Sequence, residues 1–194
     1  MTAPLLLAIA GSPRRHGNSE RLLDACLDGI AEGGANAEKL AVVEYGIEPC
    51  DGCNACSSTG ECHIRDRMQE VYPLLDAADA IVVASPVFFA TVPAALKALY
   101  DRCQPYWARR YVLGEPPPER KRPGALLLAR GGGDPYGFEA AAITTRSLFA
   151  VLGVSYDAEL CVSGVDGPRD VDGRPDALAE ARRIGAETAS RAAR

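Results

Sequence analysis

Five short runs of apolar residues, each followed by a segment with helical periodicity, are the feature that most constrains how this chain folds. The runs span residues 5–10, 39–44, 80–84, 124–129 and 154–162. They read as strands covered on both faces rather than strands with one wet face. The helical segments run from Asn18 or Ser19 to Gly33, and over 66–77, 93–103, 138–152 and 176–193. This alternation predicts an α/β fold: a doubly wound, five-stranded parallel sheet with helices on both faces.

The domain organisation follows from the length and from one irregular stretch. The 194 residues suit a single domain over 1–194, with a cysteine-rich loop insertion at about 47–65 where apolar periodicity is lost. Pro73 is expected to strain or interrupt the helix over 66–77. In a doubly wound sheet, ligands bind beyond the carboxyl ends of the strands. Unusual loops follow the first, third and fourth predicted strands, so we expect all three at that edge.

The first of these loops, residues 11–19, reads Gly-Ser-Pro-Arg-Arg-His-Gly-Asn-Ser. It joins a buried strand to a helix, so its backbone N–H groups and the helix N-terminus form a site for an anion. The chain lacks the Gly-Lys-Ser/Thr of a Walker loop, and no Gly-x-Gly-x-x-Gly follows the first strand. A compact loop lined by hydroxyls suits one terminal phosphate, such as that of FMN; an ordinary capped connection is the alternative. The predicted phosphate-binding residues are Ser12, Arg14, Gly17, Asn18 and Ser19, with side-chain donors on Ser12, Asn18 and Ser19 and a positive charge on Arg14 or Arg15.

The two other loops are expected to hold a flavin ring. An apolar wall is predicted at Pro86, Val87, Phe88 and Phe89. A close approach of the backbone is predicted at Gly131, Gly132 and Gly133, because glycine has no Cβ. The alternative is that the phenylalanines belong to the core and the glycines to an ordinary loop.

Four of the seven cysteines fall close together, at Cys50, Cys53, Cys56 and Cys62. Without a secretory signal, metal binding or redox chemistry is favoured over disulfides. Bacterial ferredoxins hold a [4Fe–4S] cluster with a similarly close run of cysteines. Structural zinc sites more often use two separated pairs, and free thiols near a flavin also fit the pattern. The spacing leaves the cluster, zinc and free thiols open.

Charge and hydropathy exclude several classes of partner. The net charge of −5, from 21 basic and 26 acidic residues, disfavours nucleic acid and anionic lipid. The N-terminus lacks the basic region of a secretory signal, and the longest uncharged stretch, 80–96, contains two prolines and is short for a membrane span. We therefore expect a cytoplasmic protein that binds neither nucleic acid nor membrane. With two histidines and no Ser-His-Asp or paired-carboxylate arrangement, no catalytic acid or base is expected.

Together these residues resemble the NAD(P)H-dependent FMN reductase family over roughly residues 4–160. Residues 11–19 resemble its phosphate loop. Residues 85–89, followed by Leu96-Lys97 and Asp101-Arg102, resemble its flavin-wall segment. Residues 49–62 resemble the cysteine loop of its iron–sulfur flavoprotein branch. The chain departs from the family at Phe88, where tyrosine is common, and at Arg67, where a second acidic residue is common.

The resemblance implies a flavodoxin-like sheet with FMN at its edge and, in the iron–sulfur branch, a [4Fe–4S] cluster on the four clustered cysteines. It implies an NAD(P)H-dependent oxidoreductase or electron-transfer flavoprotein. The donor would be NAD(P)H or a ferredoxin-like protein, and the acceptor a small molecule or a protein. It also implies a homodimer or homotetramer, with the cluster near a neighbouring subunit's flavin.

Three alternatives share parts of this pattern. One is a cluster-free reductase of quinones, free flavin, or nitro or azo compounds. The second is an electron carrier without a substrate pocket, and the third is a zinc-stabilised binding module with no redox role. The aromatic residues Tyr106, Trp107 and Tyr111 are expected at a subunit interface rather than in a substrate site, since aromatics are enriched at interfaces.

Overall fold

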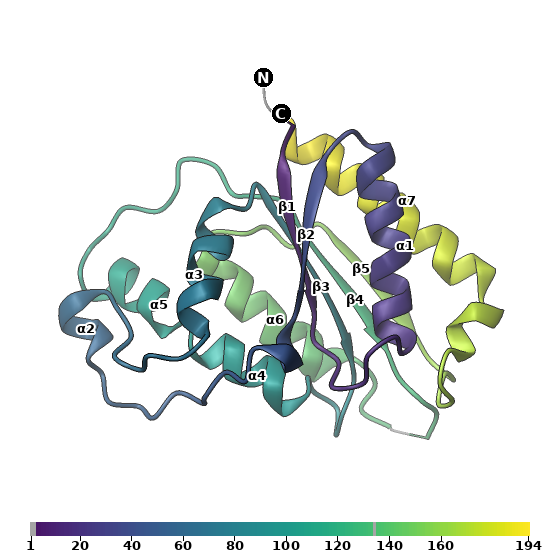
Figure 1. Ribbon diagram of the computed structural model, residues 1–194, viewed down its shortest axis with the longest axis horizontal. Helices are drawn as coiled ribbons and strands as arrows, with labels where there is room; N and C mark the ends of the chain where they lie inside the picture. The colour runs from purple at the N-terminus through teal and green to yellow at the C-terminus, as the bar shows by residue number, and fades with distance from the viewer. Residues whose placement is uncertain (1–2, 134) are drawn as a thin grey trace.

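Five parallel strands form the centre of the structure, a computed structural model that describes residues 3–133 and 135–194. The strands are β1 (Leu5–Ala10), β2 (Asn36–Ala41), β3 (Ala80–Pro86), β4 (Gly124–Ala129) and β5 (Ala158–Val162). Their order in the sheet is β2-β1-β3-β4-β5, and every pairing is parallel (Figure 1). This order is the flavodoxin-like one, so the predicted doubly wound α/β fold is confirmed.

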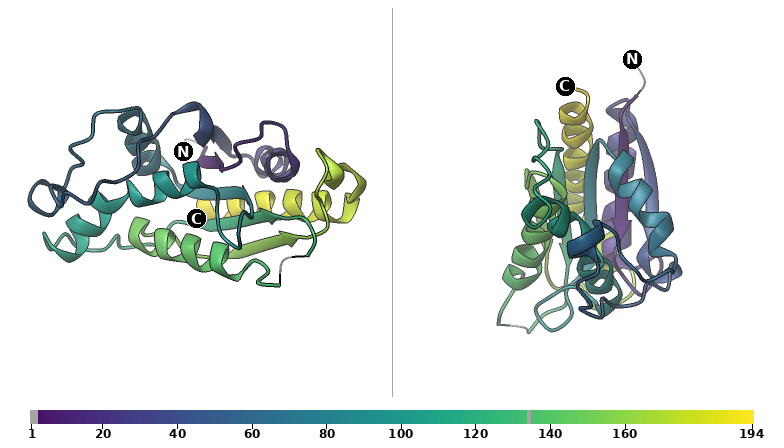
Figure 2. Two further views of the ribbon diagram at one scale, coloured as in Figure 1. Left: turned by 90° about the horizontal axis from the view of Figure 1, so that it is seen from below. Right: turned by 90° about the vertical axis from the view of Figure 1, so that its left-hand side faces the viewer.

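Helices cover both faces of the sheet. They are α1 (Asn18–Glu32), α2 (Cys56–Thr59), α3 (Met68–Ala77), α4 (Ala94–Asp101), α5 (Gln104–Tyr111), α6 (Glu139–Leu152) and α7 (Pro175–Ala192), with short 3₁₀-helices η1 (Val42–Glu44) and η2 (Asp170–Gly173). α1 and α7 lie together on one face, and α3, α4 and α6 lie on the other (Figure 2). Among the described residues, no helix combines the length and the apolar character that crossing a membrane requires.

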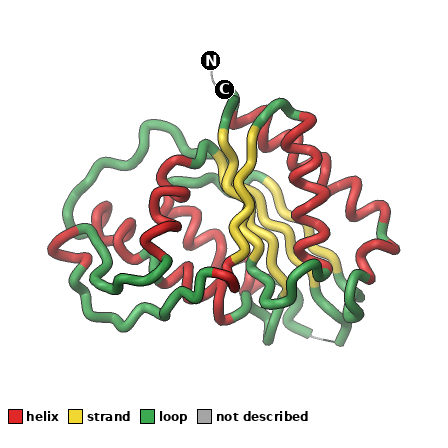
Figure 3. The backbone as a smooth tube through the Cα atoms, in the orientation of Figure 1, coloured by secondary structure: helices red, strands yellow, loops and turns green. Residues whose placement is uncertain are grey.

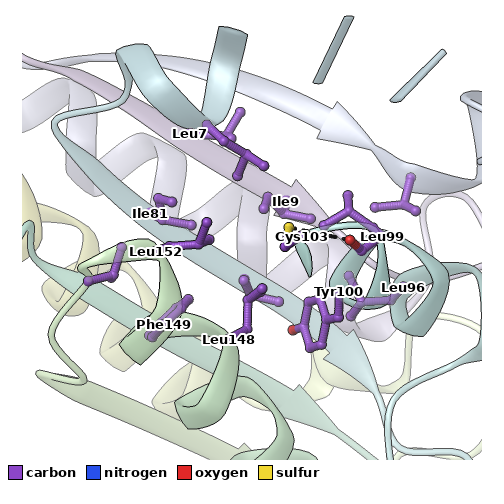
Figure 4. Packing of buried hydrophobic residues seen from close by; sticks show 14 of the residues in the cluster. Leu7, Ile9, Ile81, Leu96, Leu99, Tyr100, Cys103, Leu148, Phe149 and Leu152 are labelled. Carbon is purple, nitrogen blue, oxygen red and sulfur yellow. Dashed lines mark hydrogen bonds between the residues drawn. The ribbon is translucent and has the colours of Figure 1, made fainter. Parts of the chain in front are cut away.

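Each face of the sheet has its own apolar core, because the strand residues alternate between the two helix layers. Figure 4 shows one of these cores, where Leu7 and Ile9 of β1 lie among Leu99 of α4 and Phe149 and Leu152 of α6. The two cores fix the strands, and the strands fix where the loops at their carboxyl ends meet.

Three strands differ from their predicted bounds. β3 runs on to Pro86, two residues past its predicted end, and β2 begins at Asn36, before its predicted start. β2 ends at Ala41 because the next residues turn into η1. β5 begins only at Ala158, and Val154 makes an isolated bridge with Arg122 instead of continuing a strand. The apolar composition of these stretches predicted strands, but it does not indicate where the chain leaves the sheet.

Two helices also differ from expectation. Pro73 does not interrupt α3, since it lies on the exposed face, where water can satisfy the carbonyl that loses its partner. A separate helix, α5, follows α4 and carries Pro105 in its first turn, a position that tolerates proline. Figure 1 shows α5 beside α2 of the cysteine-rich insertion, and Trp107 of α5 lines the same cavity as the four clustered cysteines.

Candidate functional site

The loops at the carboxyl ends of β1, β3, β4 and β5 surround a cavity of about 240 Å³, called here the strand-edge cavity. Figure 3 shows these loops gathered at one edge of the sheet. The predicted residues that line the cavity are Ser12, Arg14, Gly17, Asn18, Ser19, Pro86, Val87, Phe88 and Gly131. Phe89, Gly132 and Gly133 do not line it. The cavity thus joins the three loops that the sequence placed at this edge.

The loop over residues 11–19, called here the phosphate loop after its predicted role, is held in shape by its own hydrogen bonds. The Arg14 backbone N–H donates to Ser12 Oγ at 3.0 Å, and Ser12 Oγ donates to the Arg14 carbonyl oxygen at 2.9 Å. The Ser12 hydroxyl therefore already has two partners within the loop, and it fixes the turn that leads into α1.

A buried carboxylate in the first turn of α1 fixes the rest of the loop. Glu20 accepts hydrogen bonds from Arg15 Nη2 at 2.8 Å and from the His16 backbone N–H at 2.6 Å, and Lys39 Nζ lies 2.7 Å away. Burial alone raises the pKa of Glu20, but these partners outweigh burial and bring the pKa to about 2. Arg15 also pairs with Glu44. The charge of Arg15 is therefore neutralised inside the loop.

Arg14 and Ser19 offer donors to the strand-edge cavity. Arg14 lines the cavity, and it makes no ion pair within the described part of the chain. Ser19 is 2% exposed, and its hydroxyl has no partner among residues 3–133 and 135–194. The first backbone N–H groups of α1 also lack backbone acceptors, as the first turn of a helix requires. These groups together present unpartnered donors at the start of α1 to the strand-edge cavity.

Asn18 departs from the predicted role of a side-chain phosphate donor. Its amide nitrogen donates to the carbonyl oxygens of Val165 at 3.0 Å and Gly167 at 2.9 Å, and its amide oxygen accepts from the Val171 N–H at 3.1 Å. The Asn18 side chain thus clamps the loop after β5 to the phosphate loop. Only its backbone N–H is left for an anion.

The segment after β3 forms an apolar wall of the cavity and then a strained turn. Phe88 and Thr91 exchange two backbone hydrogen bonds, at 2.8 and 3.1 Å, which close a two-residue hairpin. At its tip, Phe89 and Ala90 have φ of +49° and +68°, in the left-handed region that non-glycine residues rarely adopt. Phe88 lines the cavity, whereas Phe89 is fully exposed and does not.

The glycine loop after β4 packs against the loop after β5. A Cβ on Gly131 would lie 1.7 Å from Asp166 Oδ1, so only glycine allows this contact. The Gly132 N–H donates to Asp166 Oδ2 at 3.2 Å, and Gly132 and Gly133 are exposed. Within the described residues, Gly131 is thus the one glycine of the three whose missing Cβ allows a close approach, and the group that approaches it is the Asp166 carboxylate; the predicted approach to a flavin ring stays a prediction.

Val165 and Asp166 line the cavity and were missed from the sequence. Their loop carries no recognisable pattern of residues. It does follow a parallel strand, and that rule alone would have placed it at the same edge as the other loops. Ala129 and Arg130, at the end of β4, were also missed.

The four clustered cysteines line a second cavity of about 420 Å³, called here the cysteine cavity. Its other lining residues are Asp51, Gly52, Asn54, Ser57, His63, Asp101, Arg102, Gln104, Pro105 and Trp107. Gly52 and Gly60 have φ of +71° and +72°, so they make the tight turns expected of them and curl the chain. The structure therefore brings Cys50, Cys53, Cys56 and Cys62 to one place.

All seven cysteines are free thiols. Burial raises the pKa of the Cys56 thiol, and negative charge on Cys50, Cys53 and Cys62 raises it further. Negative charge on the other three cysteines thus disfavours the thiolate form of Cys56. A bound cation or cationic metal centre would relieve this repulsion.

A buried arginine closes the inner side of the cysteine cavity. Arg102 donates to Asp66 through Nη1 at 2.8 Å and Nη2 at 3.0 Å, and to the carbonyl oxygens of Glu48 and Ile64 at 2.9 and 3.2 Å. Asp101 and Arg102 line this cavity and not the strand-edge cavity. The segment that resembled a flavin wall thus ends at the cysteines.

Three exposed groups form a smaller arrangement at the outer rim. Asp51 Oδ2 lies 2.8 Å from His63 Nε2, and Asp51 Oδ1 accepts from the Cys53 N–H at 3.1 Å. The ligand atoms of Asp51, Cys53 and His63 all lie within 4.8 Å of one another. This mixed set of nitrogen, oxygen and sulfur is one that zinc accepts.

The chain matches the family model for NADPH-dependent FMN reductase over residues 4–162. An iron–sulfur flavoprotein of Archaeoglobus fulgidus is 36% identical over 129 residues, which cover 66% of this chain and 56% of the relative. One from Methanocaldococcus jannaschii is 40% identical over 100 residues, covering 52% of each chain. The chain thus spans about half the length of these relatives. A second A. fulgidus iron–sulfur flavoprotein is 34% identical over 148 residues, which cover 76% of this chain and 72% of the relative.

Solved structures share the fold at lower identity. The NAD(P)H:quinone oxidoreductase from Methanothermobacter marburgensis aligns with a TM-score of 0.68 at 20% identity, over 96% of this chain and 97% of its own. An archaeal flavodoxin aligns with a TM-score of 0.58 at 14% identity, over 98% and 99% of the two chains. Because the family model covers most of the sequence, this chain belongs to the NADPH-dependent FMN reductase family.

Proposed function

We propose that this protein is a flavin-dependent oxidoreductase that binds FMN in the strand-edge cavity and a [4Fe–4S] cluster in the cysteine cavity. The observation that carries the proposal is the strand-edge cavity itself. It combines the unpartnered donors at the start of α1, the apolar wall at 86–88 and the close-packed Gly131. Family membership and the iron–sulfur flavoproteins among the relatives support both cofactors.

The residues present fit the phosphate and the ring of FMN. Arg14, the Ser19 hydroxyl and the first-turn N–H groups of α1 would hold the phosphate, because they are the donors without partners in the described chain. Pro86, Val87 and Phe88 would lie beside the ring. Bound FMN supplies one- and two-electron redox chemistry, while the protein orients it and excludes water.

The cysteine cavity fits a [4Fe–4S] cluster. It provides four free thiols, the number that such a cluster requires, and a buried cation beside them. The negative charge that the cysteines impose on one another would be balanced by the iron and by Arg102. Zinc is the second candidate here, and the grouping of Asp51, Cys53 and His63 favours it.

The remaining parts of the proposal concern the whole protein. The electron donor is NAD(P)H or a ferredoxin-like protein, and the acceptor is a small molecule or another protein. We propose a cytoplasmic homodimer or homotetramer built from a single domain over 1–194. Trp107 and Tyr111, exposed on α5 beside the cysteine cavity, would contribute to the subunit interface.

The deciding experiment is an absorption spectrum of protein purified without oxygen, with FMN, iron, sulfide and zinc assayed on the same sample. Flavin bands with about four iron atoms per chain are expected. Flavin without iron or zinc would leave a cluster-free reductase, and flavin with zinc would assign the cysteine cavity to zinc. A sample that takes up no FMN, even when FMN is added, would contradict the central proposal. Oxidation of NADH or NADPH by the loaded protein then separates a reductase from an electron carrier.

A further inference from the structure

Arg102 has one hydrogen-bond donor that the protein leaves unused. Its side chain is fully buried at the end of α4. The four hydrogens on Nη1 and Nη2 have acceptors on Asp66, Glu48 and Ile64. The remaining donor, Nε–H, is buried and has no acceptor in the described part of the chain. A buried donor without an acceptor is costly and indicates a missing partner.

The place of Arg102 points to what that partner is. Arg102 lines the cysteine cavity together with all four clustered cysteines. Burial works against the charge of its guanidinium, but the bonds to Asp66 and the negative charge of Cys62 outweigh burial and raise the pKa of Arg102 above its ordinary value. The guanidinium is therefore permanently charged, and it lies in the lining of the cavity that holds the four cysteines. Sulfur that ligates iron accepts hydrogen bonds of this kind.

We propose that Arg102 sets the reduction potential of the [4Fe–4S] cluster, with Nε–H donating to cluster sulfur on the Cys62 side of the cavity. The inference rests on the proposed function, because it requires the cluster. Reduction brings in one electron and breaks no bond, so the cluster becomes more negative. A fixed cation and a hydrogen bond to sulfur both stabilise that extra charge. Arg102 thereby favours the reduced cluster.

The test measures the midpoint potential of the cluster in reconstituted protein, by an anaerobic titration followed by electron paramagnetic resonance. Arg102→Gln removes the cation and the Nε–H, and we expect the ratio of reduced to oxidised cluster at a fixed potential to fall at least tenfold. That ratio corresponds to a shift of 59 mV for a one-electron couple. Arg102→Lys keeps the charge but not the Nε–H, so its shift has the same sign and is smaller.

A second variant separates electrostatics from a structural effect. Asp66→Asn removes the counter-charge of Arg102 and leaves the guanidinium in place, so the potential should rise. If the two substitutions acted only by loosening the cysteine loop, the midpoint potentials of Arg102→Gln and Asp66→Asn would shift in the same direction. Arg109→Gln is the matched control, because Arg109 binds the same loop through the Gly60 carbonyl at 2.8 Å without lining the cysteine cavity. Its potential should match that of the wild type.

The outcomes are distinguishable. Shifts of opposite sign in Arg102→Gln and Asp66→Asn support the proposal. Shifts of the same sign, or none, in iron-loaded protein overturn it and leave the proposed function intact. A wild type that holds no iron overturns the cluster and this inference together. If Arg102→Gln retains no iron, the other two variants test the proposal. The midpoint potential should fall in Arg102→Lys and rise in Asp66→Asn, and shifts of the same sign would overturn it.

Discussion

Neighbouring residues of the same type have different roles in the phosphate loop. Arg14 faces the strand-edge cavity, whereas Arg15 is bound to Glu20 and Glu44. We expect Arg14→Gln to weaken FMN binding by at least about tenfold, because a hydrogen bond to a charged group is worth about 1.5–3 kcal/mol. Arg15→Gln removes the same charge and should change the affinity much less. Fluorescence titration of both apoproteins with FMN measures this; equal losses would contradict the assignment.

Glu20 gives the loop a predictable response to acid. Its pKa falls from an ordinary 4.5 to about 2 on folding. As the pH is lowered, the unfolded chain therefore binds a proton at this carboxylate before the folded chain does. The stabilisation is complete above pH 4.5 and is lost as the pH falls towards 2. It amounts to about 3 kcal/mol at most, at 1.36 kcal/mol for each unit of pKa. Urea unfolding should show the free energies of unfolding of wild type and Glu20→Gln converging across this window. Glu38→Gln, which removes an exposed carboxylate that has no ion pair in the described chain, should track the wild type. If the difference in free energy of unfolding between wild type and Glu20→Gln stays constant across this pH range, the low pKa of Glu20 is contradicted.

Strands, helices and turns were predictable to different degrees. The five strands and their parallel pairing follow from apolar runs alternating with helical periods, but β2 and β5, at the edges of the sheet, are only partly buried rather than covered on both faces. The helix α5 and the end of β2 could not be predicted from the sequence, because tertiary contacts rather than composition decide where those elements begin and end. At the site, the position of the loop over 11–19 at the sheet edge was predictable because a strand, a loop and a helical segment occur in order. Asp166 and Arg102 were not visible, since their roles arise from contacts with segments distant in sequence.

The hairpin beside the strand-edge cavity is an element that is held under strain. Ala90 adopts φ of +68° without the freedom of glycine. A left-handed residue with a Cβ costs about 1–2 kcal/mol, so Ala90→Gly should stabilise the protein by up to about 1 kcal/mol after the entropy of the unfolded glycine is deducted. Ala150→Gly, in the exposed face of α6, should instead destabilise it by about 0.5–1 kcal/mol. Chemical denaturation measures both, and equal destabilisation would show that the turn is not strained.

At the scale of the molecule, α4 lies between the two cavities. It begins after the hairpin of the strand-edge cavity and ends at Asp101, beside the cysteine cavity. With eight residues it spans about 12 Å, at 1.5 Å per residue. The two cavities have no lining residue in common within the described chain. One rigid helix therefore fixes their separation, although each site has its own donors.

Because the donors are separate, the two cofactors should be lost independently. Replacing Cys53 and Cys56 by serine should remove the iron and leave the FMN content unchanged, whereas Arg14→Gln should lower the FMN content and leave the iron unchanged. Replacing the buried core thiol Cys26 by alanine is the control, and it should change neither. Assays of FMN, iron and sulfide on each purified variant measure this directly. Loss of FMN together with iron in the cysteine variant would mean that the loop over 47–65 also supports the strand-edge cavity, so the two sites would form one cooperative unit joined through α4.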